Sequence, residues 1–136
     1  MEPLEIAREL YRRDPSAETF GIELVHADLD GSQVRMPVRA EICNGYGMIH
    51  GGMTFLLADT AMAFASCTSN ETALATSAQV DWVAPARVGQ TLTATARRQW
   101  SAGRTTVWDV EITTDDRTTV ALFRGRTRKV GTPVIE

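Results

Sequence analysis

Residues 44–67 read NGYGMIHGGMTFLLADTAMAFASC, and this stretch decides the fold. Between positions 53 and 65, every side chain is a hydrocarbon or a thioether except those of Thr54, Asp59 and Thr60. A helix with one side in water carries a polar stripe along that side, and this segment has none. The pattern therefore predicts a long helix, enclosed on nearly every side, at the centre of the core.

Asp59 lies in the middle of this apolar segment. Burying a carboxylate without partners is costly, so Asp59 must be hydrogen-bonded, protonated or open to a cavity. One interpretation is a structural aspartate whose oxygens accept from a neighbouring threonine or a backbone amide. The other is a reactive carboxylate that faces a substrate. Both stay open on this residue alone.

The segment His50-Gly51-Gly52 stands where a loop meets the predicted helix. Glycines allow a ligand to approach the backbone closely, and the first amides of a helix have no acceptor within it. At the positive end of the helix dipole, such amides suit an oxyanion. A tight turn into the helix is the simpler interpretation. Together with Asp59 and the side-chain amide of Asn44, however, the glycines favour a catalytic site.

Composition limits the classes of function. A chain of 136 residues is large enough for one core, so we expect a single domain over residues 1–136. The net charge of -3 gives no basic surface for nucleic acid. No apolar stretch reaches the about 20 residues that a membrane span needs, and the N-terminus lacks a secretory signal. With only Cys43 and Cys67 as thiols, we expect reduced cysteines and a cytoplasmic protein.

The rest of the chain predicts a short N-terminal helix and a series of strands. Apolar positions at helical spacing predict the helix over residues 3–13, ended by Asp14-Pro15-Ser16. Alternation and β-branched residues predict a hairpin and, after the long helix, four strands in an antiparallel meander. These strands are expected at 20–28, 33–39, 78–82, 91–99, 108–112 and 120–128. The order predicts an α+β fold in which one curved antiparallel sheet wraps around one helix.

A single helix leaves the far face and the edges of such a sheet uncovered. Small domains hide surface of this kind by pairing with copies of themselves. We therefore expect a homodimer at least.

The chain also resembles a known family. Segments 44–52, 55–61, 89–96 and 121–125 read NGYGMIHGG, FLLADTA, GQTLTATA and ALFRG. They resemble the hotdog-fold acyl-CoA thioesterases, and most of all the thioesterases of the phenylacetate-degradation cluster. The resemblance implies a hotdog fold, a curved antiparallel sheet of five to six strands around one long central helix, with a short N-terminal helix. It also implies a homotetramer built as a dimer of dimers, and no cofactor, because coenzyme A is part of the substrate.

The resemblance implies a role for four residues. Asp59 acts as nucleophile or as base on water, and the Gly51 amide donates to the oxyanion. Asn44 orients the reacting group, and His50 supports the loop. In some aryl-CoA relatives a hydroxyl residue stands one turn after the carboxylate, where this chain has Ala63.

Helix geometry adds an independent expectation about the site. Gly51 and Asp59 are eight positions apart, which in a helix is about 12 Å along the axis. An oxyanion donor and an attacking carboxylate must both lie within about 3 Å of the reacting atoms. We therefore expect a site shared across the dimer interface, with Gly51 and Asn44 from one chain and Asp59 from the other. The resemblance implies the same arrangement.

The resulting prediction is a thioesterase for an aromatic acyl-CoA such as phenylacetyl-CoA or hydroxyphenylacetyl-CoA. A hotdog acyl-CoA hydratase and a non-catalytic acyl-CoA binding protein are the alternatives, and the binding protein would not need Asp59. A nucleophile at Cys43 or Ser66 lacks the sequence signature of such hydrolases. The two histidines and two cysteines match no zinc pattern.

The last predicted strand carries three arginines on one face. Alternation places them at Arg124, Arg126 and Arg128. One interpretation is a solvated sheet edge that deters aggregation, and the other is a contact for the phosphates of coenzyme A.

Overall fold

The computed structural model describes residues 1–136, with three α-helices, one short 3-10 helix and six strands. The helices are α1 (Pro3–Arg12), α2 (Pro15–Phe20), α3 (Gly51–Ser66) and the 3-10 helix η1 (Ala40–Ile42). The strands are β1 (Glu23–Asp28), β2 (Gly31–Pro37), β3 (Glu71–Trp82), β4 (Thr91–Ala102), β5 (Thr105–Thr113) and β6 (Thr119–Pro133).

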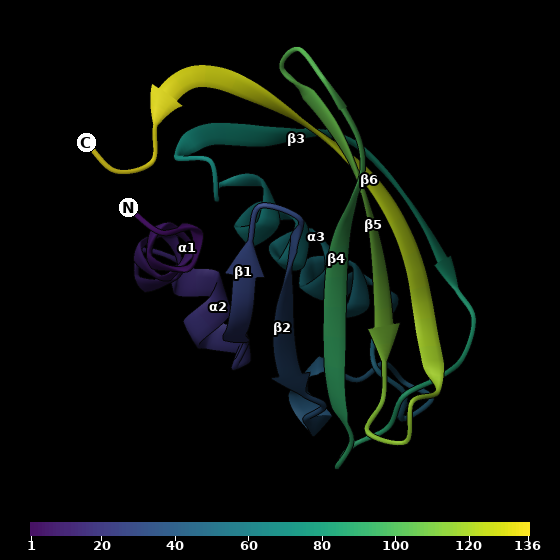
Figure 1. Cartoon of the computed structure of the whole chain (residues 1–136). Coiled ribbons are helices and arrows are strands. Elements are labelled where there is room, and N and C mark those ends of the chain that lie inside the picture. Colours follow the sequence, from purple (N-terminus) through teal and green to yellow (C-terminus); the bar gives the residue numbers. More distant parts are fainter.

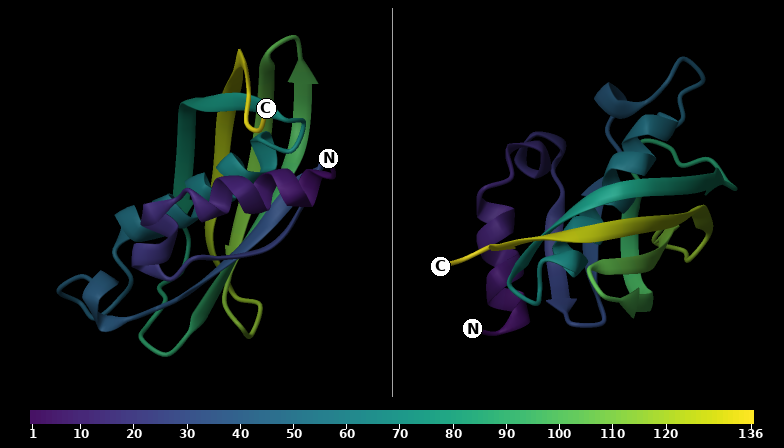
Figure 2. Two further views of the ribbon diagram at one scale, coloured as in Figure 1. Left: turned by 90° about the vertical axis from the view of Figure 1, so that its left-hand side faces the viewer. Right: turned by 90° about the horizontal axis from the view of Figure 1, so that it is seen from above.

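All six strands form one antiparallel sheet in the order β1-β2-β4-β5-β6-β3. The sheet curves around α3, and α1 and α2 lie beside β1 (Figure 1). The two termini lie near one another, and the loop around residues 40–50 projects from another part of the molecule (Figure 2). The expected architecture, one curved antiparallel sheet around a central helix with a short N-terminal helix, is confirmed.

The expected four-strand meander is wrong in one strand. β4, β5 and β6 follow one another in the sheet, but β3 pairs with β6 at the far edge instead of with β4. β3 also begins at Glu71 rather than at Ala78. No residue from Glu71 to Trp82 is buried in the single chain, so the alternation at residues 78–82 does not correspond to a buried strand face there.

The segment that ends the first helix also begins a second one. The Asp14 side chain accepts from the Ala17 amide at 3.0 Å, and Pro15 occupies the first helical position, so α2 starts here. Gly21 ends α2 with φ of 69°, a conformation that glycine adopts without strain. The first strand therefore starts at Glu23 and not at residue 20.

The core forms between α3 and the concave face of the sheet. Buried side chains of α3, among them Leu57, Met62 and Phe64, belong to one cluster of 27 buried apolar residues. Gly125 of β6 faces the helix, and a Cβ there would lie 2.3 Å from Met62 Sδ. Glycine at this position therefore lets the central helix pack directly against the sheet backbone.

One stripe of α3 nevertheless stays uncovered in the single chain, contrary to the expectation of a helix enclosed on nearly every side. Gly52 and Ala63 are exposed, and Leu56 and Asp59 are only half-buried. These positions are three and four residues apart, so they share one face of the helix. β3 likewise pairs only with β6, which leaves its other edge free.

Candidate active site

The start of α3 presents one free backbone donor. His50 is the N-cap, and its Nδ1 accepts from the Gly52 amide at 2.9 Å. The His50 carbonyl accepts from the amides of Met53 and Thr54, at 2.9 and 3.3 Å. The Gly51 amide donates to no acceptor of the chain. Of the first helical amides, Gly51 is thus the one available to a ligand.

Gly51 also lies against an aromatic side chain that sequence reasoning missed. Trp82 Nε1 donates to the Gly51 carbonyl at 3.2 Å. A Cβ on Gly51 would lie 3.1 Å from two atoms of the indole, so glycine allows this close packing. Alternation predicts a buried strand face for Trp82, but it is 57% exposed in the single chain. The only signal for its role was its position at the end of a strand, before Pro85.

Asp59 lies about two turns further along α3, on the uncovered stripe. Burial raises the pKa of its carboxyl, and no hydrogen bond or neighbouring charge opposes this. The Thr60 hydroxyl donates to the Leu56 carbonyl at 2.7 Å, and the buried Thr54 hydroxyl has no partner. No threonine or amide of the chain satisfies Asp59, which argues against the structural interpretation.

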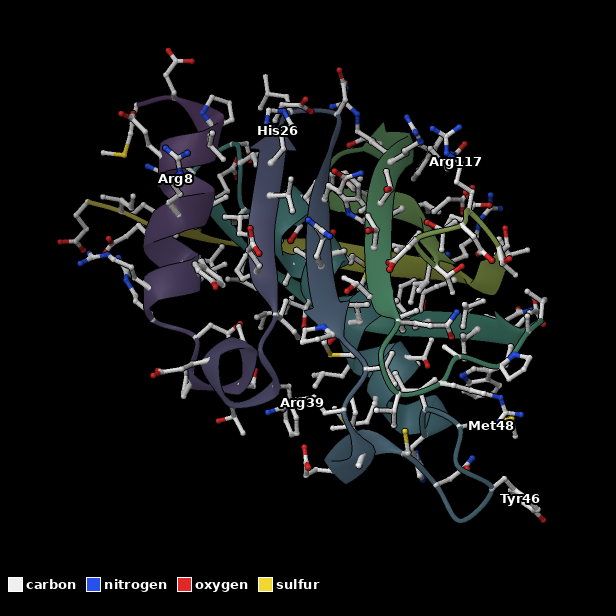
Figure 3. The ribbon with its side chains drawn as sticks, turned by 90° about the horizontal axis from the view of Figure 1, so that it is seen from below. Arg8, His26, Arg39, Tyr46, Met48 and Arg117 are labelled. Carbon is white, nitrogen blue, oxygen red and sulfur yellow. The ribbon has the colours of Figure 1, made fainter.

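Asn44 closes the loop that leads to the helix. Its Oδ1 accepts from the backbone amides of Tyr46 and Met48, at 2.9 and 3.3 Å. The Asn44 backbone amide donates to the Met48 carbonyl at 2.7 Å. Figure 3 shows Tyr46 and Met48 on this loop at the margin of the molecule. The Asn44 side-chain NH2 has no partner in the chain, so the side chain shapes the loop with its oxygen and keeps its donors free.

The loop is anchored on both sides of the site. The Ile49 amide donates to the Ala86 carbonyl at 2.8 Å, and the His50 amide donates to the Ile42 carbonyl at 2.9 Å. The chain thus brings Asn44, His50 and Gly51 together where the loop joins α3. It does not bring Asp59 to them, because Asp59 lies about 12 Å further along the same helix.

An apolar groove of about 300 Å³ lies beside the helix start. The loop before α3 and the segment after β3 supply most of its walls. Its lining residues are Met48, Ile49, Thr54, Trp82, Val83, Ala84, Pro85 and Val120. Such a surface suits the uncharged part of a ligand rather than its phosphates.

The other candidate nucleophiles make ordinary hydrogen bonds. The Cys43 thiol donates to the Arg39 carbonyl at 3.4 Å, and the Ser66 hydroxyl donates to the Ala63 carbonyl at 3.0 Å. His26 lies at the opposite end of the molecule from Met48 (Figure 3). No hydrogen bond joins a histidine to the Cys43 thiol or to the Ser66 hydroxyl. No three histidine, cysteine, aspartate or glutamate side chains lie close enough together to hold a metal ion.

The arginine face of β6 is solvated, but it is not a sheet edge. β6 lies between β5 and β3, so the expectation of an edge strand is wrong. Arg124 forms a two-point ion pair with Asp109, at 2.6 and 2.8 Å. Arg126 and Arg128 are exposed on the same face.

Comparison with known proteins decides the family. The family described as the thioesterase superfamily matches residues 46–121. The chain belongs to this superfamily. The acyl-coenzyme A thioesterase PaaI of Escherichia coli K12 is 38% identical over 125 residues, which cover 92% of this chain and 89% of that protein.

Solved structures of superfamily relatives support the same assignment. The structure of the E. coli PaaI protein from the phenylacetic acid degradation operon has a TM-score of 0.93 and 37% identity, over 95% of this chain and 94% of that one. The TT0310 protein of Thermus thermophilus has a TM-score of 0.83 and 34% identity, over 87% and 99%. The resemblance of the sequence motifs to the hotdog-fold acyl-CoA thioesterases is confirmed. The expected hotdog fold and the expected thioesterase class are confirmed as well. No helix of this superfamily member is long and apolar enough to cross a membrane.

Proposed function

We propose that the chain hydrolyses the thioester of an aromatic acyl-CoA, such as phenylacetyl-CoA or hydroxyphenylacetyl-CoA, to the free acid and coenzyme A. The observation that carries the proposal is Asp59, a half-buried carboxylate without a partner on a helix that has no other charged side chain. The free Gly51 amide at the start of the same helix supplies the second group that this reaction needs. The E. coli relative PaaI, which is named an acyl-coenzyme A thioesterase and comes from the phenylacetic acid degradation operon, supports the substrate class.

In the proposed reaction, negative charge develops on the thioester oxygen as its carbonyl carbon is attacked. The Gly51 amide donates to this oxygen, and loss of one such donor elsewhere costs roughly 2.7–4 kcal/mol. Asp59 has two possible roles. As a nucleophile, its oxygen bonds to the carbonyl carbon and expels the thiolate, and water then hydrolyses the mixed anhydride. As a base, it takes a proton from the water that attacks.

The geometry supports a site built from two subunits. Asp59 and the Gly51 amide of one chain are about 12 Å apart along the axis, too far to act on one carbonyl. The uncovered stripe of α3 contains Asp59, so a second copy lying on this stripe would cover the helix and bring its own helix start to the carboxylate. A two-fold axis would then give two equivalent sites, each with Asp59 of one chain and Gly51 and Asn44 of the other.

Two further side chains have supporting roles in this proposal. The free NH2 of Asn44 orients the reacting group, while its oxygen holds the loop. His50 supports the loop by fixing the Gly52 amide. Beyond the dimer we propose a tetramer built as a dimer of dimers, and a cytoplasmic location in which Cys43 and Cys67 stay reduced, as the free thiols here. No cofactor takes part.

Release of free coenzyme A thiol tests the proposal. The panel contains phenylacetyl-, hydroxyphenylacetyl-, benzoyl- and straight-chain acyl-CoA, with wild type beside Asp59→Asn and the control Asp81→Asn on exposed β3. We expect wild type to hydrolyse the aryl substrates. The turnover rate should fall roughly 10²-fold or more in Asp59→Asn and stay at the wild-type value in Asp81→Asn. Wild type that binds acyl-CoA without releasing thiol would support a binding protein instead. Hydration of an enoyl-CoA without thiol release would support a hydratase.

A further inference from the structure

Two side chains hold the peptide group between Gly51 and Gly52 at both of its ends. Its carbonyl oxygen accepts from Trp82 Nε1 at 3.2 Å, and its N–H donates to His50 Nδ1 at 2.9 Å. Both atoms belong to one planar peptide unit. This unit therefore cannot rotate without breaking a hydrogen bond to Trp82 or to His50.

The Gly51 amide lies directly before this unit, and its direction depends on the backbone angles of Gly51. Glycine has more backbone freedom than any other residue, so a free amide on glycine needs outside support to keep one direction. The His50 carbonyl, on the other side, is held by the amides of Met53 and Thr54. With Trp82 in place, the peptide units on both sides of the Gly51 α-carbon are fixed.

Trp82 itself comes from a fixed part of the sheet. It is the last residue of β3 and lies opposite Ala121 of β6. The next two amides, of Val83 and Ala84, both donate to the Val120 carbonyl, at 2.9 and 3.2 Å. The indole is thus held on the sheet, although more than half of its residue surface is exposed. Its N–H bond to Gly51 is the polar contact that orients the ring.

We propose that Trp82 is a positioning residue for thioester hydrolysis, whose indole N–H holds the Gly51 carbonyl so that the Gly51 amide stays directed at the substrate oxygen. This inference rests on the proposed function. Pre-aligned donors stabilise a transition state because they need no reorganisation during the reaction. Trp82 acts through Gly51 and does not touch the reacting atoms.

The indole also forms one wall of the apolar groove of about 300 Å³ beside the helix start. Loss of the ring would therefore change substrate binding as well as the direction of the amide. Trp82→Phe separates the two effects, because phenylalanine keeps an aromatic ring but has no N–H donor. Trp100→Phe is the matched control, since Trp100 is 55% exposed on β4 and makes no side-chain hydrogen bond.

Steady-state kinetics and amide hydrogen exchange of the Trp82→Phe and Trp100→Phe proteins test the proposal. In Trp82→Phe we expect kcat to fall about three- to tenfold, the range for loss of one uncharged hydrogen bond, and KM to change less than about twofold. We also expect the Gly52 amide to exchange faster, because its peptide unit keeps the bond to His50 and the helix bond from the Phe55 amide but loses the bond from Trp82. Trp100→Phe should match wild type in all three quantities.

A Trp82→Phe protein with wild-type kcat and wild-type exchange at Gly52 would overturn the proposal, as would an equal fall of kcat in Trp100→Phe. A change in KM alone would show that Trp82 only lines the groove, which also overturns it. If wild type hydrolyses no thioester, the proposed function fails first. The exchange rate of Gly52 then decides by itself whether Trp82 holds this peptide unit.

Discussion

His50 Nδ1 accepts a hydrogen bond from the Gly52 amide at 2.9 Å, so His50 is the N-cap of α3. This contact gives His50 a structural role that depends on its ring nitrogen. We expect His50→Ala to lower the free energy of unfolding by about 1 kcal/mol. His50→Asn should keep most of that stability, because asparagine caps helices well. Urea denaturation of both variants measures this, and equal stability of alanine and asparagine would contradict the capping role.

Gly51→Pro removes the Gly51 N–H and also crowds the Trp82 indole. Proline suits the first helical position, and His50 has ψ of 134°, a conformation compatible with a following proline. The added Cβ would lie 3.1 Å from the indole, which must shift by a few tenths of an ångström, and the lost positioning accounts for at most about tenfold of the effect. We expect a folded protein whose kcat falls roughly 10²- to 10³-fold, the cost of an oxyanion donor. Activity within a few-fold of wild type would show that the Gly51 amide is not the donor.

The raised pKa of Asp59 predicts a stability difference that depends on pH. Burial holds the pKa of the Asp59 carboxyl above its ordinary value of 3.8, so the folded protein binds this proton more tightly than the unfolded chain. The resulting stabilisation is complete below pH 3.8 and is lost as the pH rises through the folded-state pKa. Asp59→Asn should thus gain stability over wild type as the pH rises to neutrality.

Thermal or urea unfolding across this pH range measures the difference between Asp59→Asn and wild type. Asp81→Asn is the control, because Asp81 is an exposed carboxylate on β3. If the free energy of unfolding of Asp59→Asn instead fell relative to that of wild type as the pH rises, Asp59 would have a stabilising partner in the folded protein.

The uncovered stripe of α3 predicts the position of the subunit contact. Ala63 is exposed there, so Ala63→Glu should leave the fold of each chain intact. A glutamate on a buried interface without a partner is costly, so we expect dissociation and loss of activity. Ala102→Glu, at the exposed end of β4, is the control. Sedimentation measures the mass, and an active Ala63→Glu oligomer would place the interface elsewhere.

The central helix could be predicted because its signal is local. The apolar segment indicates the core helix, and its interruption by Asp59 and its opening by Gly51 indicate the groups that we propose as reactive. The partner of β3 could not be predicted in the same way. Its strand has no buried face in the single chain, and strand order depends on contacts between distant segments.

The second helix and Trp82 were missed for different reasons. Asp14-Pro15 carries a recognisable helix start, but the same residues also end the preceding helix, and only the ending was inferred. Trp82 fits the alternation of a strand, and its contact with Gly51 joins residues 31 positions apart. No pattern within either segment reports that contact.

In the proposed dimer, one catalytic site takes Asp59 from one subunit and the Gly51 amide from its partner. Co-expression of Asp59→Asn with Gly51→Pro tests it most directly, by thiol release from the best aryl-CoA substrate. Each variant alone should keep at most about a hundredth of wild-type activity. A mixed dimer should contain one intact site of two, and random pairing makes about half of the dimers mixed, so the co-expressed population should recover about a quarter of wild-type activity. Mixed dimers that form, as shown by two affinity tags, but stay as inactive as the parent variants would contradict the shared site.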